Sequence, residues 1–290
     1  MAPRVIMLCT GTPAPDMAHW GSSFIVGIGG EWLMFDCGHG ANYKLHKAGF
    51  QSTQIDRMFF THHHSDHDAD YPSFLLTRFD MSIGKESELR VYGPKLTEQL
   101  TDRLLGEPNG AYWHDVVART KHPLSVAAYV ERGGIPPRKP PKIHARDIKP
   151  GTVASGKNWE ITAVEVDHVQ PYLDSLAYRI DSDEGSIVFS GDTSPCKSLT
   201  DLATGADLLV MECIKIDEDM IPGSPSFDTE TGTFGAAQTA KDANVKPLAL
   251  VHQQGKMEET VRKSQALFEV KSVYDGPVIW GEELLEVPWE

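Results

Sequence analysis

The sequence predicts an α/β fold in which two β-sheets pack face to face and helices cover their outer faces. Three observations support this. Short apolar runs typical of strands occur in both halves of the chain, helical segments separate them, and in each half a metal-type residue follows the end of a strand. The 290 residues suit one large layered domain, so we expect a single domain over residues 1–290.

The first half begins with strands joined by tight turns. Apolar runs predict strands at Arg4–Cys9, Ser22–Ile28, Glu31–Phe35, Arg57–Phe60 and Glu88–Tyr92. Gly29-Gly30 joins the second and third of these as a hairpin, because glycine tolerates the backbone of a tight turn. Helices are predicted at Ala41–Ala48, at Ala69–Phe79, and from Pro94 to Leu105, where proline suits the first helical turn.

The second half repeats this plan. Strands are predicted as a pair within Thr152–Val166 and then at Ser175–Ile180, Ser186–Ser190, Asp207–Glu212 and Pro247–His252. Helices are predicted at Pro195–Ala203, Phe234–Ala243 and Met257–Phe268. Two segments, Gly106–Pro150 and Asp217–Gly232, are irregular and rich in turn residues. Long irregular insertions in a compact domain are usually functional lids or disordered segments.

Composition disfavours some classes of function. The formal net charge is −14, and a protein that grips nucleic acid normally shows a basic face, so the charge balance disfavours a nucleic-acid partner. The four cysteines have no CxxC spacing, and the first residues carry neither a charged leader nor a long apolar run. We therefore expect a cytoplasmic protein without a membrane span, whose cysteines are small buried thiols.

The motif that carries chemistry is Thr61-His62-His63-His64-Ser65-Asp66-His67. Its spacing, His-x-His-x-Asp-His, places imidazole and carboxylate donors on one tight loop after an apolar strand, which suits zinc or a similar divalent ion. On an extended loop His62 and His64 share a face, while Asp66 and His67 turn toward a second ion. A surface histidine cluster is the alternative, and four spaced donors directly after a buried strand disfavour it.

This spacing resembles the signature of the metallo-β-lactamase fold. Further pieces follow in that family's order, each at the end of an apolar strand: Asp36-Cys37-Gly38, His168, Gly191-Asp192-Thr193 and His252. Each piece alone is weak, since a lone histidine is more often an ordinary one, but their order extends the resemblance from Val5 to His252. It implies an αββα sandwich of two mixed β-sheets flanked by helices, with the site along one edge of the sheets.

The resemblance also implies a ligand set and a mechanism. One ion is expected on His62, His64 and His168, and the other on Asp66, His67 and His252, with Asp192 as the bridge. Two zinc ions per chain are implied, with manganese or iron as alternatives, and Asp66 and Asp192 are the expected catalytic residues. The implied reaction is hydrolysis by a hydroxide that bridges the ions. Asp36 is expected to orient a ligand.

Within the fold, the opening Leu8–Pro13 and the segment Ser175–Ile180 resemble the branch that contains ribonuclease Z and the arylsulfatase-like hydrolases. Three departures argue against ribonuclease Z itself. Met211-Glu212 stands where those enzymes carry a His-Glu pair, the interval from His168 to Asp192 is too short for a tRNA-gripping arm, and the chain is acidic. Against this, residues 106–150 are locally basic, although a solvated loop is favoured there. The basic residues are Arg132, Arg138, Lys139, Lys142, Arg146 and Lys149.

The leading hypothesis is therefore cleavage of a small organic molecule: an ester, lactone, cyclic amide or aryl sulfate. The alternative is phosphodiester hydrolysis or tRNA 3′ processing of the ribonuclease Z type; a metal-binding or redox protein without hydrolytic activity comes third. We expect residues 106–150 to form a lid over the metal edge or to contact a homodimer partner. The expected substrate-binding residues are His19 and Trp20 at the pocket rim and Tyr112, Trp113 and His114 in the lid.

Overall fold

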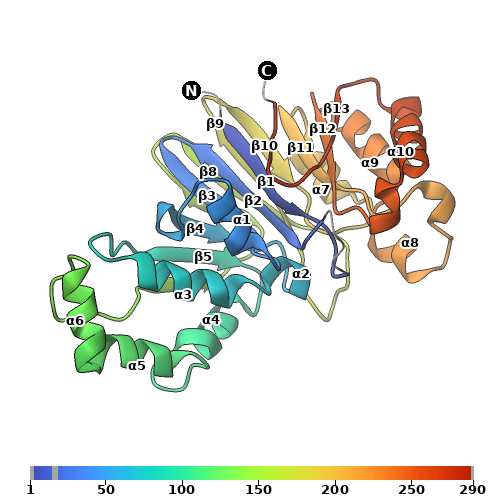
Figure 1. Ribbon diagram of the computed structural model, residues 1–290. Coiled ribbons are helices and arrows are strands. Elements are labelled where there is room, and N and C mark those ends of the chain that lie inside the picture. Colours follow the sequence, from blue (N-terminus) through green and yellow to red (C-terminus); the bar gives the residue numbers. More distant parts are fainter. Residues whose placement is uncertain (1–2, 15–18, 289–290) are drawn as a thin grey trace.

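The computed structural model describes residues 3–14 and 19–288. Two seven-stranded sheets pack against each other, and helices cover both outer faces (Figure 1). This confirms the predicted sandwich of two mixed sheets flanked by helices. Among the described residues, no helix has the length and apolar character needed to cross a membrane.

The first sheet has the strand order β14-β1-β2-β3-β4-β5-β6. The strands are β1 (Arg4–Thr10), β2 (Ser22–Ile28), β3 (Glu31–Phe35), β4 (Ile55–Phe59), β5 (Leu89–Gly93), β6 (Ile143–Asp147) and β14 (Leu285–Glu286). β1 to β3 pair antiparallel, whereas β3 to β6 pair parallel. Parallel neighbours require crossover connections. The helices in these connections are α1 (Ala41–Lys47), α2 (Ser65–Asp68), α3 (Tyr71–Met81), α4 (Thr97–Leu105), α5 (Trp113–Lys121) and α6 (Pro123–Glu131).

The second sheet has the order β13-β12-β11-β10-β9-β8-β7. The strands are β7 (Gly151–Ser155), β8 (Trp159–Glu165), β9 (Leu176–Ser182), β10 (Gly185–Phe189), β11 (Leu208–Glu212), β12 (Leu248–Val251) and β13 (Val278–Trp280). β7 to β10 pair antiparallel and β10 to β13 parallel. The helices of this half are α7 (Lys197–Ala203), α8 (Pro225–Thr229), α9 (Thr233–Asp242) and α10 (Thr260–Val273).

The central strands are buried on both faces, which explains why they appear in the sequence as continuous apolar runs. In β3, Phe35 points into the layer between the sheets, while Met34 packs under the helices of the first half. In β10, Phe189 faces the same inner layer and Val188 faces the helices of the second half. Phe35 stacks on Phe189 with ring centroids 4.6 Å apart, so aromatic packing joins the two sheets.

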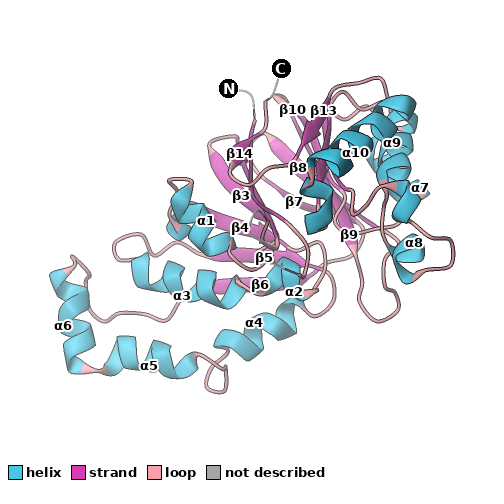
Figure 2. Cartoon of the chain, turned by 45° about the vertical axis from the view of Figure 1, so that its right-hand side comes forward, coloured by secondary structure: helices cyan, strands magenta, loops and turns pink. Residues whose placement is uncertain are grey.

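Regular structure in the segment 106–150 is the main difference from the sequence prediction. The segment contains α5, α6 and β6, and β6 extends the first sheet beside β5. Pro123 occupies the first turn of α6 and Gly133 follows its end with φ +94°, so residues that suggest irregular chain in fact mark the ends of a helix. In both views α5 and α6 extend away from α2 (Figures 1 and 2). The role of this segment as a lid stays a prediction.

Candidate metal centre

Seven metal-type side chains gather where strands of both sheets end. His62 and His64 follow β4, and the single turn of α2 adds Asp66 and His67. From the second sheet, His168 follows β8, Asp192 follows β10 and His252 follows β12. Residues far apart in the sequence meet here because the ends of these strands lie at the same edge of the sandwich. The segment Thr61–Asp68, predicted as a loop, forms a short helix from Ser65 onward.

The side chains form two groups whose donor atoms lie within 4.8 Å of one another, and Asp192 belongs to both. One group is His62, His64, His168 and Asp192, and the other is Asp66, His67, His252 and Asp192. In the first group, His64 Nδ1 lies 3.0 Å from His62 Nε2 and 3.2 Å from His168 Nε2. In the second, His252 Nε2 lies 3.0 Å from Asp66 Oδ2 and 3.2 Å from Asp192 Oδ2. This grouping is the one that the family resemblance implies.

An unpaired polar atom shows that the donor set fits a cation. Within the described residues, His67 Nε2, the nitrogen that faces Asp192, is buried without a hydrogen-bond partner. Burying an unpaired polar atom is costly, and a divalent ion bound to this nitrogen and to the Asp192 carboxylate would offset that cost. Three imidazole nitrogens that converge on one point also cannot all be satisfied by one another's protons. Imidazole and carboxylate donors together suit zinc and similar divalent ions.

The electrostatics of the two groups differ. Burial lowers the pKa of His62 well below its usual value, and burial also lowers that of His64, so both imidazoles favour the neutral form that binds metal. Burial also opposes the charged forms of His67 and Asp192, but their mutual attraction and that of their neighbours outweigh it. The pKa of His67 is therefore raised, and that of Asp192 lies well below its usual range. Asp192 is thus a carboxylate at neutral pH.

Asp36 lies beneath the second group and orients one of its members. Its Oδ1 accepts a hydrogen bond from the Thr61 backbone N–H at 2.7 Å, and its Oδ2 accepts from the Thr61 hydroxyl at 2.8 Å. The His67 Nδ1 lies 2.8 Å from the same Oδ2. A proton on Nδ1 leaves Nε2, which faces Asp192, without one. Asp36 therefore selects the tautomer of His67 that binds a cation, as expected for a residue that orients a ligand.

Two backbone features hold the ends of these strands together. A Cβ on Gly38 would lie 1.8 Å from the Asp66 carbonyl oxygen, so only glycine allows this close approach between the end of β3 and α2. His252 adopts the left-handed region with φ +65°, and its N–H donates to the Thr10 carbonyl at 2.8 Å. Strained backbone of this kind concentrates at functional sites.

Two glutamates to which the sequence analysis gave no role lie near Asp192 and His168. Glu212 at the end of β11 is buried, and its Oε2 accepts a hydrogen bond from the N–H of Thr193, the residue after Asp192. Burial and the neighbouring Glu230 raise the pKa of Glu212 well above its usual value. Glu230 Oε1 lies 4.0 Å from His168 Nδ1. The one signal in the sequence is Glu212 itself, a charged residue ending an apolar strand.

His168 is oriented by a backbone carbonyl and not by a side chain. Its Nδ1 lies 2.8 Å from the Thr229 carbonyl oxygen at the end of α8, so the proton belongs on Nδ1 and Nε2 faces the first group. Met211, the residue where the ribonuclease Z branch carries histidine, is fully buried in the helix-side core. It contributes packing and no proton donor.

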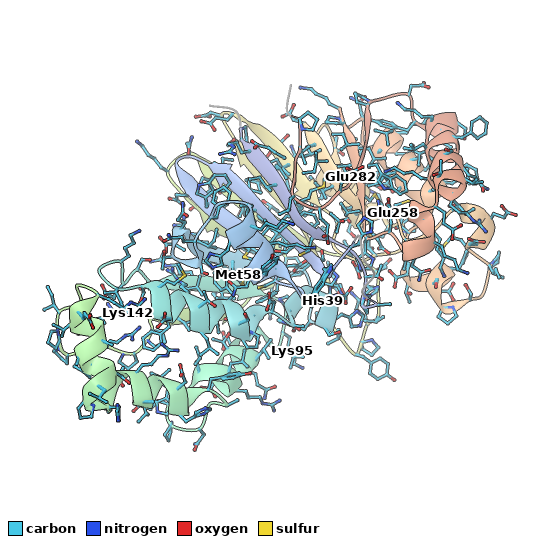
Figure 3. All side chains as sticks on the ribbon, viewed as in Figure 1. His39, Met58, Lys95, Lys142, Glu258 and Glu282 are labelled. Atoms are coloured by element: carbon cyan, nitrogen blue, oxygen red, sulfur yellow. The ribbon has the colours of Figure 1, made fainter. Side chains whose placement is uncertain are left out.

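The structure separates the residues expected to bind substrate. His19 is buried with its Nε2 3.6 Å from Glu258 Oε1, while Trp20 is half-exposed and its ring centroid lies 6.1 Å from that of His39. Figure 3 labels Glu258 and His39, the partners of these two residues. In α5, Trp113 packs against the core under the first sheet. The rings of Tyr112 and His114 lie 6.5 Å apart. Among the described residues, Trp20, Tyr112, Trp113 and His114 make no hydrogen bond, ion pair or ring contact with the two metal-type groups. The roles of all five residues stay predictions.

Solved structures with the same fold cover nearly the whole chain. The metallo-beta-lactamase fold protein YhfI from Bacillus subtilis matches with a TM-score of 0.73 and 18% identity, over 99% of each chain. The short form of human tRNase Z matches with a TM-score of 0.69 and 18% identity, also over 99% of each chain. At this level of identity the likeness establishes the fold alone.

Curated relatives correct the expected partner. Ribonuclease Z of Mycolicibacterium gilvum is 30% identical over 256 residues, which cover 86% of this chain and 83% of the relative. Ribonuclease Z of Mycobacterium sp. strain KMS is 28% identical over 255 residues, again 86% of this chain. Relatives that act on RNA contradict the expectation of a small-molecule substrate with nucleic acid disfavoured. The net charge misled because a sum over the whole chain does not describe where charges lie on the surface.

The family itself follows from a match to a family model. Residues 21–223 match the model of the metallo-beta-lactamase superfamily, a range that contains every metal-type residue of the two groups except His252. The two sheets, the order of the motifs and the two donor groups that share Asp192 agree with this match. The chain therefore belongs to the metallo-β-lactamase superfamily, and it is a metal-dependent hydrolase of that superfamily.

Proposed function

We propose that this protein is a dinuclear-metal phosphodiesterase that cleaves RNA, of the ribonuclease Z type. The proposed RNA substrate is supported by the similarity to curated ribonuclease Z proteins, which spans 86% of the chain at up to 30% identity. The two donor groups that share Asp192 support the metal-dependent chemistry. Phosphodiester hydrolysis suits such a site, because paired cations clamp both the attacking and the leaving oxygen of a phosphate.

In this proposal each donor group holds one ion. The first ion belongs to His62, His64 and His168, the second to Asp66, His67 and His252, and Asp192 is shared. Zinc is the proposed metal, because the donors are imidazole nitrogens and carboxylate oxygens, and manganese or iron are compatible with the same set. When bound, two such ions acidify a water molecule and neutralise developing charge on the phosphate.

The residues of the chain perform the remaining tasks. Asp66 Oδ2 is engaged by His252, whereas its Oδ1 has no hydrogen-bond partner among the described residues. We assign Oδ1 the proton of the attacking water, because it is the unpaired carboxylate oxygen within the second donor group. Asp192 is held between His67 at 3.2 Å and His252 at 3.2 Å, which fixes its orientation.

Cleavage of a structured RNA tests the proposal. The substrate is a precursor tRNA with a single-stranded 3′ extension, compared with bis-nitrophenyl phosphate, a chromogenic lactone and an aryl sulfate. We expect the parent protein, loaded with zinc, to cut the RNA and the phosphodiester far faster than the lactone or the sulfate. Efficient hydrolysis of the lactone or the sulfate without any cleavage of RNA would overturn the proposal.

The His-rich loop offers a matched pair of variants for this test. His64→Ala removes a member of the first donor group and should abolish cleavage and lower metal content. His63 lies next to it but in neither group; its Nδ1 is 3.2 Å from Asp68 Oδ2 and its Nε2 is 2.8 Å from the Thr97 hydroxyl. His63→Ala should therefore keep its metal content. Equal loss of metal in both variants would contradict the proposed ligand set.

A further inference from the structure

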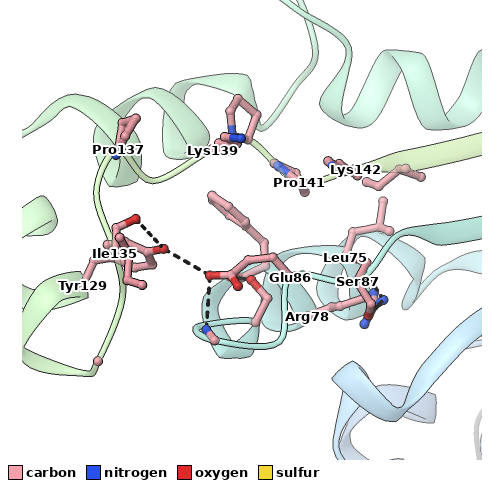
Figure 4. Close-up of a pocket in the computed structure, with 16 residues that line it drawn as sticks. Leu75, Arg78, Glu86, Ser87, Tyr129, Ile135, Pro137, Lys139, Pro141 and Lys142 are labelled. Atoms are coloured by element: carbon pink, nitrogen blue, oxygen red, sulfur yellow. Dashed lines mark hydrogen bonds between the residues drawn. The ribbon is translucent and has the colours of Figure 1, made fainter.

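A cavity of about 320 Å³ lies between the end of α3 and the inserted segment, and no metal-type residue of the two donor groups lines it. Its walls come from α3, the turn at residues 84–87, α6 and the chain from residue 133 to 143 (Figure 4). Figure 3 places Lys142 beside α6, far from His39 near α2. The cavity is therefore separate from the metal centre, and its volume falls within the roughly 300–1,000 Å³ typical of ligand sites.

The walls of this cavity are fixed without a ligand. The Arg138 guanidinium lies over the ring of Phe79 at 4.3 Å and over that of Tyr129 at 5.2 Å, and it donates to the Phe79 carbonyl at 2.7 Å. The Tyr129 hydroxyl donates to Glu86 Oε1 at 3.1 Å. A Cβ on Gly134 would lie 2.4 Å from the Tyr129 ring, so the chain packs directly on that ring. A preformed wall lowers the entropic cost of binding.

The charges on the lining lie on opposite sides. Lys139 and Lys142 are exposed and line the cavity. Lys142 also attracts Glu88, which helps to lower the pKa of that carboxyl. Arg78 is already engaged by Asp56 at 2.6 Å. Figure 4 shows the Glu86 carboxylate across the cavity from Lys139. The lining thus offers two ammonium groups on one side and a carboxylate acceptor on the other.

Apolar side chains fill the space between these charges. Leu75, Phe79, Ile135 and Ile143 line the cavity together with three prolines. A ligand that satisfies all three parts of the lining needs an anionic group, an apolar body and an N–H donor. A simple anion lacks the apolar body, and a fatty acid lacks the donor.

We propose that this cavity binds one nucleotide, with its phosphate against Lys139 and Lys142 and its base between the apolar walls. The amino group of the base then donates to Glu86, since carboxylates accept hydrogen bonds from amino groups of bases. The nucleotide is either free or an unpaired unit of an RNA chain; both sources present the same chemistry. The inference goes beyond the proposed function, because the cavity recognises its ligand through its own residues, apart from the metal centre.

Fluorescence titration of the full chain tests the proposal, with 2-aminopurine riboside 5′-monophosphate as the free nucleotide. The double variant Lys139→Ala/Lys142→Ala should weaken binding by about tenfold or more, because each lysine contributes a charge-assisted hydrogen bond. Glu86→Gln should weaken it less. Lys85→Ala is the matched control: Lys85 is exposed in the same turn as Glu86 but does not line the cavity. It should leave the affinity unchanged.

A short single-stranded RNA that carries 2-aminopurine separates the two sources. If the parent protein binds the mononucleotide and the double variant does not, the cavity is a site for a free nucleotide. If the parent binds only the RNA and the double variant does not, the cavity binds a nucleotide within an RNA chain. The proposal is overturned when neither probe binds or when the double variant binds both as the parent does. Cleavage of the precursor tRNA is scored separately, so a parent that binds the nucleotide without cutting RNA refutes the proposed function and leaves this inference standing.

Discussion

The substitution Asp36→Asn tests whether the buried Asp36 carboxylate selects the tautomer of His67. Asp36 accepts hydrogen bonds from the Thr61 N–H and hydroxyl and from His67 Nδ1. An asparagine amide replaces one acceptor oxygen with a donor, and that donor must face either His67 or the Thr61 N–H. When it faces His67, Nδ1 has to accept and the proton moves to Nε2, the atom that faces Asp192. A protonated Nε2 cannot bind a cation.

The magnitude follows from what is lost. The side chain keeps its size, so the free energy of unfolding should fall by only about 1–3 kcal/mol, the cost of one donor left unsatisfied in a buried site. Metal affinity should fall more, by roughly 10- to 100-fold, because a partner that orients a ligand has been reversed. The loss should fall on the group that contains His67, since Asp36 does not contact His62, His64 or His168 through the hydrogen bonds found among the described residues.

Competition with a chromogenic chelator measures the affinities of the two sites, and elemental analysis counts the ions. We expect about two zinc ions in the parent and about one in Asp36→Asn under the same conditions. Asp68→Asn is the control, because Asp68 pairs in the same way with His63, which belongs to neither group. Two tightly held ions in Asp36→Asn, with parental activity, would refute the tautomer argument.

Three further predictions concern packing and charge. Gly38→Ala should displace α2, because the new Cβ would lie 1.8 Å from the Asp66 carbonyl oxygen; elemental analysis should show lost metal, and full occupancy would contradict the close approach. Arg138→Ala should lower the free energy of unfolding by roughly 2–4 kcal/mol, because ring contacts and a hydrogen bond are lost. Lys139 is exposed, so Lys139→Ala should change the free energy of unfolding by less than about 0.5 kcal/mol. Similar effects of the two substitutions in denaturant titrations would be inconsistent with a structural role for Arg138. The pKa of Glu212 is raised, so its contribution to stability is present at low pH and is lost as pH rises through the folded pKa. Between about pH 5 and pH 9, the melting temperature of metal-free Glu212→Gln should fall less than that of the parent; an equal fall would show that Glu212 has the same pKa in the folded and unfolded protein.

The sequence alone determined the layers of the fold and the identity of the metal-type residues. Both depend on local spacing: apolar runs mark strands buried on two faces, and His62, His64, Asp66 and His67 lie within six positions. The remaining members of the donor groups each end an apolar strand, which the chain order reveals. The expectation of a small-molecule partner, which the ribonuclease Z relatives contradict, rested partly on net charge, a sum over the whole chain that does not describe where charges lie on the surface.

Only the tertiary structure decided which groups surround those residues. The Thr229 carbonyl reaches His168 across 61 positions, and Glu212 meets Glu230 from a different element. Arg138 appears in the sequence as one more basic loop residue, yet it is 8% exposed and held over two aromatic rings. Such contacts depend on how separate elements pack, and spacing along a chain reports only neighbours within one element. The sequence therefore specified the chemistry of the site, while packing specified its tautomers, its buried carboxylates and the cavity beside α6.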